Sequence, residues 1–83
     1  VVGEREVTIV EFKTDRVVPA GDSGVPRAYV TQLALYRVAV ARMFEGRAVN
    51  CGILWTAGPK LTMLAPKLLD ESARALDPPA RGS

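Results

Sequence analysis

Apolar and polar residues alternate along this chain in a way that predicts strands and helices in turn. The segment from Val7 to Arg16 (VTIVEFKTDR) predicts a strand with apolar side chains on both faces, which is typical of a strand inside a sheet. Val1 and Val2 predict the end of an earlier strand, and Gly3 to Glu6 predict a tight turn between the two. The residues from Thr14 to Val25 include proline and glycine breakers, so we expect a loop there.

A long helix is predicted from Pro26 to about Phe44. Apolar residues recur there at helical spacing, and proline suits the first turn of a helix. Further apolar residues lie on the flanks, so we expect this helix to be buried over much of its circumference. Gly46 is expected to end it.

The second half of the chain predicts two strands and a short helix. Val49 to Thr56 (VNCGILWT) predicts one strand, and Leu61 to Leu64 predict a strand that returns beside it. A short helix opens at Pro66, and its apolar side carries Leu68, Leu69, Ala73 and Leu76. The fold class is therefore α/β, a mixed sheet with one long packed helix and a short C-terminal helix.

One small domain is all that 83 residues can form. We assign residues 1–77 to it and residues 78–83 to a flexible tail. Because a strand already ends at Val2, we expect the domain to be incomplete at its N-terminus. No apolar run approaches the ~20 residues of a membrane span, and no signal segment opens the chain, so we expect a cytoplasmic protein without a membrane partner.

The content of metal-ligating and nucleophilic residues excludes several classes of site. Cys51 is the single cysteine and histidine is absent, which excludes an internal disulfide, a zinc cluster and a Ser-His or Cys-His hydrolase site within the chain. Cys51 lies in an apolar run and is expected to be a small core residue. Any metal bound here is expected to be a hard, oxygen-liganded ion, magnesium or manganese.

Glu11 and Lys13 are the first candidate for chemistry. They share one face of the predicted strand, and charges at the end of a buried strand need a partner or a metal. Metal-assisted phosphodiester hydrolysis uses such a pair: Glu11 would hold a divalent cation, and Lys13 would orient water or offset charge developing on phosphorus. The alternative is an ordinary structural ion pair.

Gln32 and Tyr36 form a second polar feature, on the long helix. They are four residues apart and face the same way within a stripe that is otherwise apolar. If the helix packs across the Glu11 and Lys13 end of the strand, Gln32 can orient a metal-bound water and Tyr36 can touch a phosphate or base. The alternative is that Tyr36 belongs to the core and Gln32 caps a backbone group.

Arginine dominates the basic residues, although a net charge of +2 does not by itself indicate a nucleic acid partner. Four arginines lie in or just after the predicted long helix: Arg27, Arg37, Arg42 and Arg47. Arginine suits bidentate phosphate contacts, so these residues are candidates for DNA binding. A solvated helix face is the alternative.

Three motifs follow one another along the chain: VEFKTDR (Val10 to Arg16), QLALYR (Gln32 to Arg37) and ILWT (Ile53 to Thr56). In this order and spacing they resemble the RecB-type nuclease domain of the PD-(D/E)XK superfamily. The resemblance is strongest to the C-terminal end of that domain in the AddA family of bacterial helicase-nucleases, and it spans about residues 1–70. It implies that the chain is a fragment of a PD-(D/E)XK, restriction-endonuclease-like nuclease core.

The resemblance also implies roles for individual residues. Glu11 matches the second acidic metal ligand, for Mg²⁺ or Mn²⁺, and Lys13 the catalytic lysine. Gln32 and Tyr36 match a Q-x-x-x-Y motif that supports the site and contacts DNA, and Thr14 to Arg16 match the residues that follow the lysine. With Lys13 and Glu11, Gln32 is taken as catalytic, and the expected DNA-binding residues are Tyr36, Arg37 and Arg16.

The family's first metal-binding aspartate has no counterpart here, since only Glu4 and Glu6 precede Glu11 as acids. We therefore expect the isolated chain to be inactive and to associate with itself. The resemblance implies that the parent is an ATP-dependent helicase-nuclease, a Mg²⁺-dependent DNA exonuclease of double-strand-break repair, with ATP bound outside this chain and an AddB-like second subunit. The alternatives are a non-catalytic interaction module of a repair complex and a fragment of a restriction-type endonuclease, which leaves the Q-x-x-x-Y helix unexplained.

Overall fold

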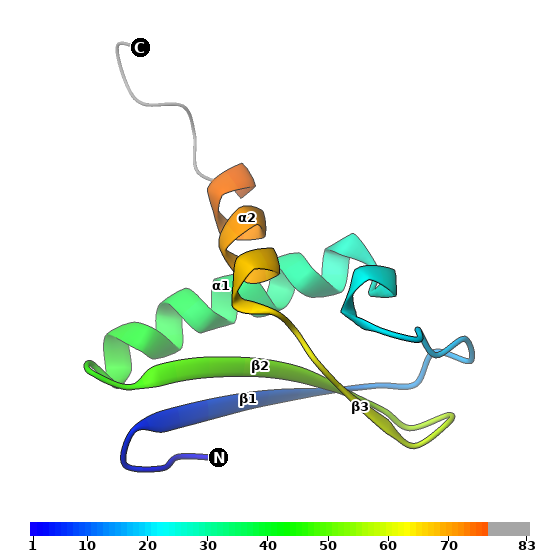
Figure 1. The fold of residues 1–83 in the computed structure, drawn as a ribbon, viewed down its shortest axis with the longest axis horizontal. Helices are drawn as coiled ribbons and strands as arrows, with labels where there is room; N and C mark the ends of the chain where they lie inside the picture. Colours follow the sequence, from blue (N-terminus) through cyan, green and yellow to red (C-terminus); the bar gives the residue numbers. More distant parts are fainter. Residues whose placement is uncertain (77–83) are drawn as a thin grey trace, which may run out of the picture.

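The computed structural model describes residues 1–76, which form a mixed three-stranded sheet and two helices (Figure 1). Strands β1 (Glu6–Lys13) and β2 (Ala48–Trp55) are parallel, and β3 (Lys60–Met63) pairs antiparallel with β2. Helix α1 (Arg27–Met43) connects β1 to β2, and α2 (Pro66–Leu76) follows β3. The predicted α/β class is confirmed, while the predicted tail at residues 78–83 lies outside the described residues.

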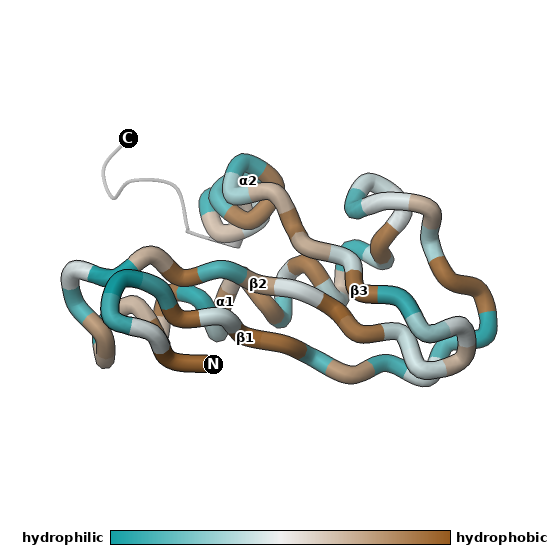
Figure 2. Tube along the Cα trace, turned by 60° about the horizontal axis from the view of Figure 1, so that its bottom comes forward, coloured by the Kyte–Doolittle hydropathy of each residue, from teal (hydrophilic) through white to brown (hydrophobic). Residues whose placement is uncertain are grey.

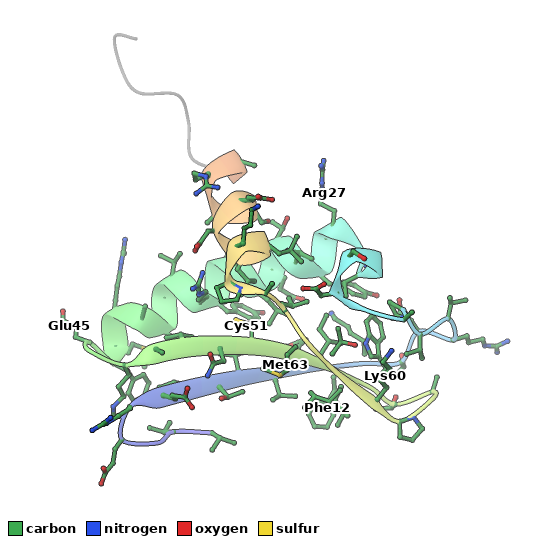
Figure 3. The ribbon with its side chains drawn as sticks, viewed as in Figure 1. Phe12, Arg27, Glu45, Cys51, Lys60 and Met63 are labelled. Carbon is green, nitrogen blue, oxygen red and sulfur yellow. The ribbon has the colours of Figure 1, made fainter. Side chains whose placement is uncertain are left out.

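The core lies between the sheet and the helices. Strand β2 is the central strand, and its alternate residues face α1, as expected for a strand with one covered face. In Figure 3, Cys51 projects from β2 into the space below α1, which confirms its expected place in the core. The largest fully buried side chains are Trp55, Leu33, Ile53, Leu69 and Cys51.

The elements begin and end close to the predicted positions. Helix α1 ends at Met43, and Gly46 follows with φ of +81°, a left-handed conformation that glycine adopts without strain. The predicted loop before α1 contains one short 3₁₀ turn, η1 (Asp22–Gly24). On α2, Leu69 is buried and Leu68 and Ala73 pack against the core, as the pattern predicted.

The expectation that the first strand is internal is wrong for the described residues. Strand β1 is an edge strand of the three-stranded sheet, and only Val1 and Val2 pair with the start of its outer edge. Its second face is only partly covered, since Val10 is half-buried and Phe12 is 65% exposed. Apolar side chains on both faces of β1 therefore did not mean that other elements pack on both faces.

The surface of the sheet opposite α1 is apolar and open. Adjacent positions on the three strands bring its residues together, because Phe12 lies beside Leu54 and Leu54 beside Leu61. We call this surface the open sheet face; it consists of Val10, Phe12, Leu54, Leu61 and Met63. Figure 2 shows hydrophobic segments of β1 and β2 side by side, and in Figure 3 Phe12 projects away from both helices.

Gly52 leaves room on this face for the side chain of Met63. A Cβ at position 52 would stand 2.7 Å from the Met63 Sδ atom, so any larger residue would displace the methionine. The flat centre of the open sheet face thus depends on a glycine in the central strand.

Helix α1 is less buried than its composition predicted. Its inward side carries Val30, Leu33 and Ala34 in the core, but Leu35 and Met43 are 55% and 73% exposed. The sheet covers one side of the helix and α2 covers part of another, so the C-terminal half of α1 keeps an exposed apolar side among the described residues. None of the helices in this part of the chain combines the length and the apolar character of a membrane span.

Candidate active site

Lys13 and Glu11 lie on the face of β1 that α1 covers. The Lys13 Nζ atom donates a hydrogen bond to the Gln32 Oε1 atom at 3.2 Å and lies 3.8 Å from a Glu11 carboxylate oxygen. The Lys13 side chain is 18% exposed and that of Glu11 is 31% exposed, so the pair is partly shielded from water and still accessible. The helix therefore does pack across the charged end of the strand.

Gln32 connects this pair to Tyr36. Its Nε2 atom donates to the Tyr36 hydroxyl at 3.2 Å. An ammonium group can only donate hydrogen bonds, so the amide must turn its oxygen to Lys13 and its nitrogen to Tyr36. The result is a chain of hydrogen bonds, Lys13 to Gln32 to Tyr36, that runs from the strand end to an exposed tyrosine. Gln32 does not act as a cap for a backbone group in this arrangement.

Tyr29 and Asp15 complete the cluster, and the sequence pattern gave neither a role in the site. The Lys13 Nζ atom lies 4.2 Å from the centre of the Tyr29 ring, within the range of a cation-π contact. The Tyr29 hydroxyl lies 2.8 Å from both Asp15 carboxylate oxygens, to which it donates. This contact, together with burial and the negative charge of Asp15, raises the pKa of Tyr29 above its ordinary value. The spacing of Tyr29 three residues before Gln32 is the signal that could have identified it.

The third motif supports the cluster from the central strand. Trp55 pairs with Lys13 across the sheet, and its ring lies 6.1 Å from the Tyr29 ring in a tilted arrangement. The Trp55 Nε1 atom donates to Thr62 at 2.9 Å, which satisfies the buried indole. The Thr56 backbone N–H donates to the Lys13 carbonyl at 3.0 Å. The ILWT segment thus binds the backbone of Lys13 through Thr56 and packs against the Tyr29 ring through Trp55.

The two arginines expected to bind DNA differ in their surroundings. Arg16 is exposed in the loop just after β1. Arg37 forms an ion pair of 2.6 Å with Asp70 on α2 and donates to the Val49 carbonyl at 3.4 Å. Arg37 therefore ties α1 to α2 and β2, and a DNA phosphate would have to compete with Asp70 for it. DNA contact by either arginine remains a prediction.

Glu11 is the side chain best suited to hold a hard cation. It offers a partly exposed carboxylate, whereas the Asp15 carboxylate already accepts the hydroxyl proton of Tyr29. Among residues 1–76 no group of three or more metal-ligating side chains gathers at one point. Magnesium is commonly held by one or two carboxylates together with substrate phosphates and water. Glu11 fits one position of such a site, and the described residues do not complete it.

Two other features lie apart from the cluster. Cys51 is fully buried, and burial raises the pKa of its thiol although the Arg37 charge opposes the shift. A pocket of about 460 Å³ lies between η1, α1 and α2 and includes none of the cluster residues. Its Thr31 and Ser72 hydroxyls lie 3.3 Å apart and bond to each other. Neither feature adds a group to the candidate site.

Comparisons with models of protein families, with curated proteins and with solved structures found no match to this chain. The case for a function therefore comes from the residues themselves. Three segments that are far apart in the sequence, around Lys13, Gln32 and Trp55, meet at one end of the sheet. The order of the motifs along the chain does not by itself require this contact.

Proposed function

We propose that this chain is the C-terminal portion of a RecB-type PD-(D/E)XK nuclease domain, within an AddA-like ATP-dependent helicase-nuclease. The parent enzyme would hydrolyse phosphodiester bonds of unwound DNA with Mg²⁺ during double-strand-break repair, together with an AddB-like second subunit. This would be a cytoplasmic exonuclease, and its ATP site would lie outside residues 1–83.

The observation that carries this proposal is the hydrogen-bonded chain from Lys13 through Gln32 to Tyr36, beside Glu11. A structural ion pair on a sheet edge needs only its two partners. Here Gln32 also accepts a hydrogen bond from Lys13, and its amide nitrogen donates one to the exposed hydroxyl of Tyr36. Such a network places a cation next to a carboxylate in a partly dry environment, where charges act more strongly than in water.

Each residue then has a defined task. Glu11 would contribute one oxygen ligand to magnesium, which supplies Lewis-acid polarisation of the phosphate when bound. Lys13 would offset the negative charge that develops on the phosphate oxygens, and Gln32 would hold the ammonium in place for that. Tyr36, Arg16 and Arg37 would contact the DNA strand, where arginine and hydroxyl groups position phosphates.

The test uses the longer protein that the proposal implies, purified with its second subunit. Lys13→Ala should reduce Mg²⁺-dependent DNA degradation about 10²- to 10³-fold, the typical cost of one preorganised group that stabilises transition-state charge. ATPase and unwinding rates should stay at the level of the unmodified protein, because they depend on a separate site. Lys67→Ala, at an exposed lysine on α2, is the matched control.

The result that overturns the proposal is full nuclease activity in Lys13→Ala. A first check needs only the coding sequence upstream of Val1. Helicase motifs should be found there, and an aspartate on a predicted strand should lie within about 15 residues upstream of Val1. An aspartate without helicase motifs would favour a restriction-type nuclease, and the absence of the aspartate would favour a protein without catalysis.

A non-catalytic module is the second candidate, and one observation favours it. The described residues gather no three-ligand metal group, while they present the open sheet face as a surface for contact. In that case Glu11 and Lys13 would stabilise the fold only. Lys13→Ala would then lower the free energy of unfolding and leave DNA degradation by the complex unchanged, which separates the two candidates.

A further inference from the structure

Tyr29 contacts three residues of the candidate site: Lys13, Asp15 and Trp55. One face of its ring lies under the Lys13 ammonium, with 4.2 Å between the Nζ atom and the ring centre. Its hydroxyl donates to Asp15, two residues after the lysine. Its ring also lies beside that of the fully buried Trp55. These contacts join the end of β1, the start of the following loop and the central strand β2 to the helix.

The Lys13 ammonium has three N–H donors and meets three electron-rich groups. Gln32 offers an amide oxygen at 3.2 Å, Glu11 a carboxylate at 3.8 Å, and Tyr29 the negative face of an aromatic ring. A lysine side chain has four flexible methylene groups, and a single partner does not fix its end. Contacts from three directions restrict the Nζ atom to one place.

Asp15 holds the Tyr29 ring in its place beside the Lys13 ammonium. Both of its oxygens lie 2.8 Å from the Tyr29 hydroxyl, and a hydrogen bond to a charged acceptor is stronger than one between neutral groups. Trp55 in turn is held by its own hydrogen bond to Thr62. The Tyr29 ring is therefore held at its hydroxyl end and along one side, and it cannot easily swing away from the lysine.

We propose that Tyr29, oriented by Asp15, is a positioning residue that holds the Lys13 ammonium beside Glu11. The effect of Tyr29 on catalysis rests on the proposed nuclease function. The position of the Lys13 ammonium over the Tyr29 ring can be tested without that function. Tyr29 acts through Lys13 and does not touch the reacting atoms. Loss of the ring should therefore slow turnover more than it weakens DNA binding.

The first experiment uses the full 83-residue chain and proton NMR of the Lys13 Cε methylene. Protons above an aromatic ring face are shifted upfield, so this group should be upfield of the other two lysines. The shift should disappear in Tyr29→Leu, stay largely in Tyr29→Phe, and be reduced in Asp15→Asn because the ring is then held less firmly. Phe44→Leu, which removes an aromatic ring at the C-terminal end of the same helix, is the matched control and should leave the shift unchanged.

The outcomes are decisive in either direction. A Lys13 methylene at the same position as the other lysines in the unmodified chain overturns the proposal, and so does an unchanged upfield shift in Tyr29→Leu. Amide spectra establish whether each variant is folded. If Tyr29→Leu does not fold, Asp15→Asn decides, since an undiminished shift there contradicts the role given to Asp15.

A second experiment, in the longer enzyme, measures the effect of Tyr29 on DNA degradation. Tyr29→Leu should lower kcat for DNA degradation about 10- to 100-fold, since a small displacement of a catalytic group costs about this much, with little change in KM. Tyr29→Phe should recover most of the loss because it keeps the ring. If Lys13→Ala has no effect on degradation, the nuclease proposal fails while the NMR result still stands for the geometry. If Lys13→Ala is inactive and Tyr29→Leu is fully active, only the positioning role fails.

Discussion

The amide oxygen of Gln32 accepts a hydrogen bond from the ammonium group of Lys13 at 3.2 Å, although the two residues are 19 positions apart in the sequence. This contact joins the end of β1 to the middle of α1. It also sets the direction of the amide, so that the nitrogen is left to donate to Tyr36.

Gln32 should matter more to catalysis than Tyr36. In the longer enzyme, Gln32→Ala removes a hydrogen bond to a charged group, worth about 1.5–3 kcal/mol, and should lower DNA degradation about 10- to 100-fold. Tyr36→Phe removes one neutral hydroxyl contact, worth about 0.5–1.5 kcal/mol, and should cost about 2- to 10-fold. Because the two side chains bond to each other, the double variant should lose less than the product of the two effects.

Initial rates of nucleotide release at saturating DNA measure these effects. Leu35→Ala, an exposed change on the same helix, is the control and should keep the unmodified rate. Equal rates for Gln32→Ala and the unmodified enzyme would show that the amide does not support the lysine in catalysis.

The chain alone should bind Mg²⁺ or Mn²⁺ only weakly. Glu11 supplies one hard oxygen ligand, and a dication gives up its hydration shell only for several such ligands. Titration calorimetry should give a dissociation constant well above the micromolar range, and Glu11→Ala should remove the remaining heat. Asp15→Asn should remove less of the heat than Glu11→Ala, since the Asp15 carboxylate is already bound by the Tyr29 hydroxyl. Micromolar binding that depends on Glu11 would show that the site is complete within this chain.

The chain should associate with a second copy of itself through the open sheet face. Parallel strands are normally covered on both sides, whereas here Phe12 and Leu61 are 65% and 53% exposed. Two strands of eight residues and one of four, each about 4.8 Å wide and about 3.3 Å long per residue, give a face of roughly 320 Å². This is less than the ~800 Å² per partner of a stable interface, so the dimer should form only at high concentration.

Light scattering over a concentration series measures this association. Phe12→Ser and Leu61→Ser should shift the chain to monomer. Leu35→Ser, a change of the same kind at an exposed leucine of α1, should not. A clean monomer of the unmodified chain at millimolar concentration would exclude the open sheet face as a contact between copies.

Stability should fall above about pH 9. Burial raises the pKa of the Cys51 thiol above its ordinary 9.0, and the hydrogen bond to Asp15 raises the pKa of Tyr29 above its ordinary 10.0. Between its ordinary and its raised pKa, each group keeps its proton in the folded state and loses it in the unfolded state. The contribution of both groups is therefore complete below pH 9, and the free energy of unfolding falls as the pH rises further.

Urea unfolding between pH 7 and pH 11 measures the effect, and Cys51→Ala isolates the thiol. The difference in free energy of unfolding between the unmodified chain and Cys51→Ala should be constant up to about pH 9 and decrease beyond it. A difference that stays constant to pH 11 would mean that Cys51 ionises alike in both states.

The local pattern predicted most of the secondary structure because it depends on neighbours in the chain. Gly46 lies in the turn that follows α1, where the backbone is left-handed, a conformation that glycine adopts freely. Alternating apolar residues in β2 face the core, since side chains in a strand point to opposite sides in turn. In contrast, the same alternation in β1 did not reveal that Phe12 would be exposed, because cover depends on elements far away in the sequence.

Some features of the candidate site were likewise determined by the sequence alone, and others by the tertiary structure. The spacing of Glu11 and Lys13, and of Gln32 and Tyr36, put each pair on one face of its element, and the sequence alone determined that much. Whether Lys13 meets Gln32 was decided by the packing of α1 on the sheet. The parts played by Tyr29 and Asp15 were likewise decided by tertiary structure, because a cation-π contact and a hydrogen bond between a loop and a helix need a distance that no local pattern fixes.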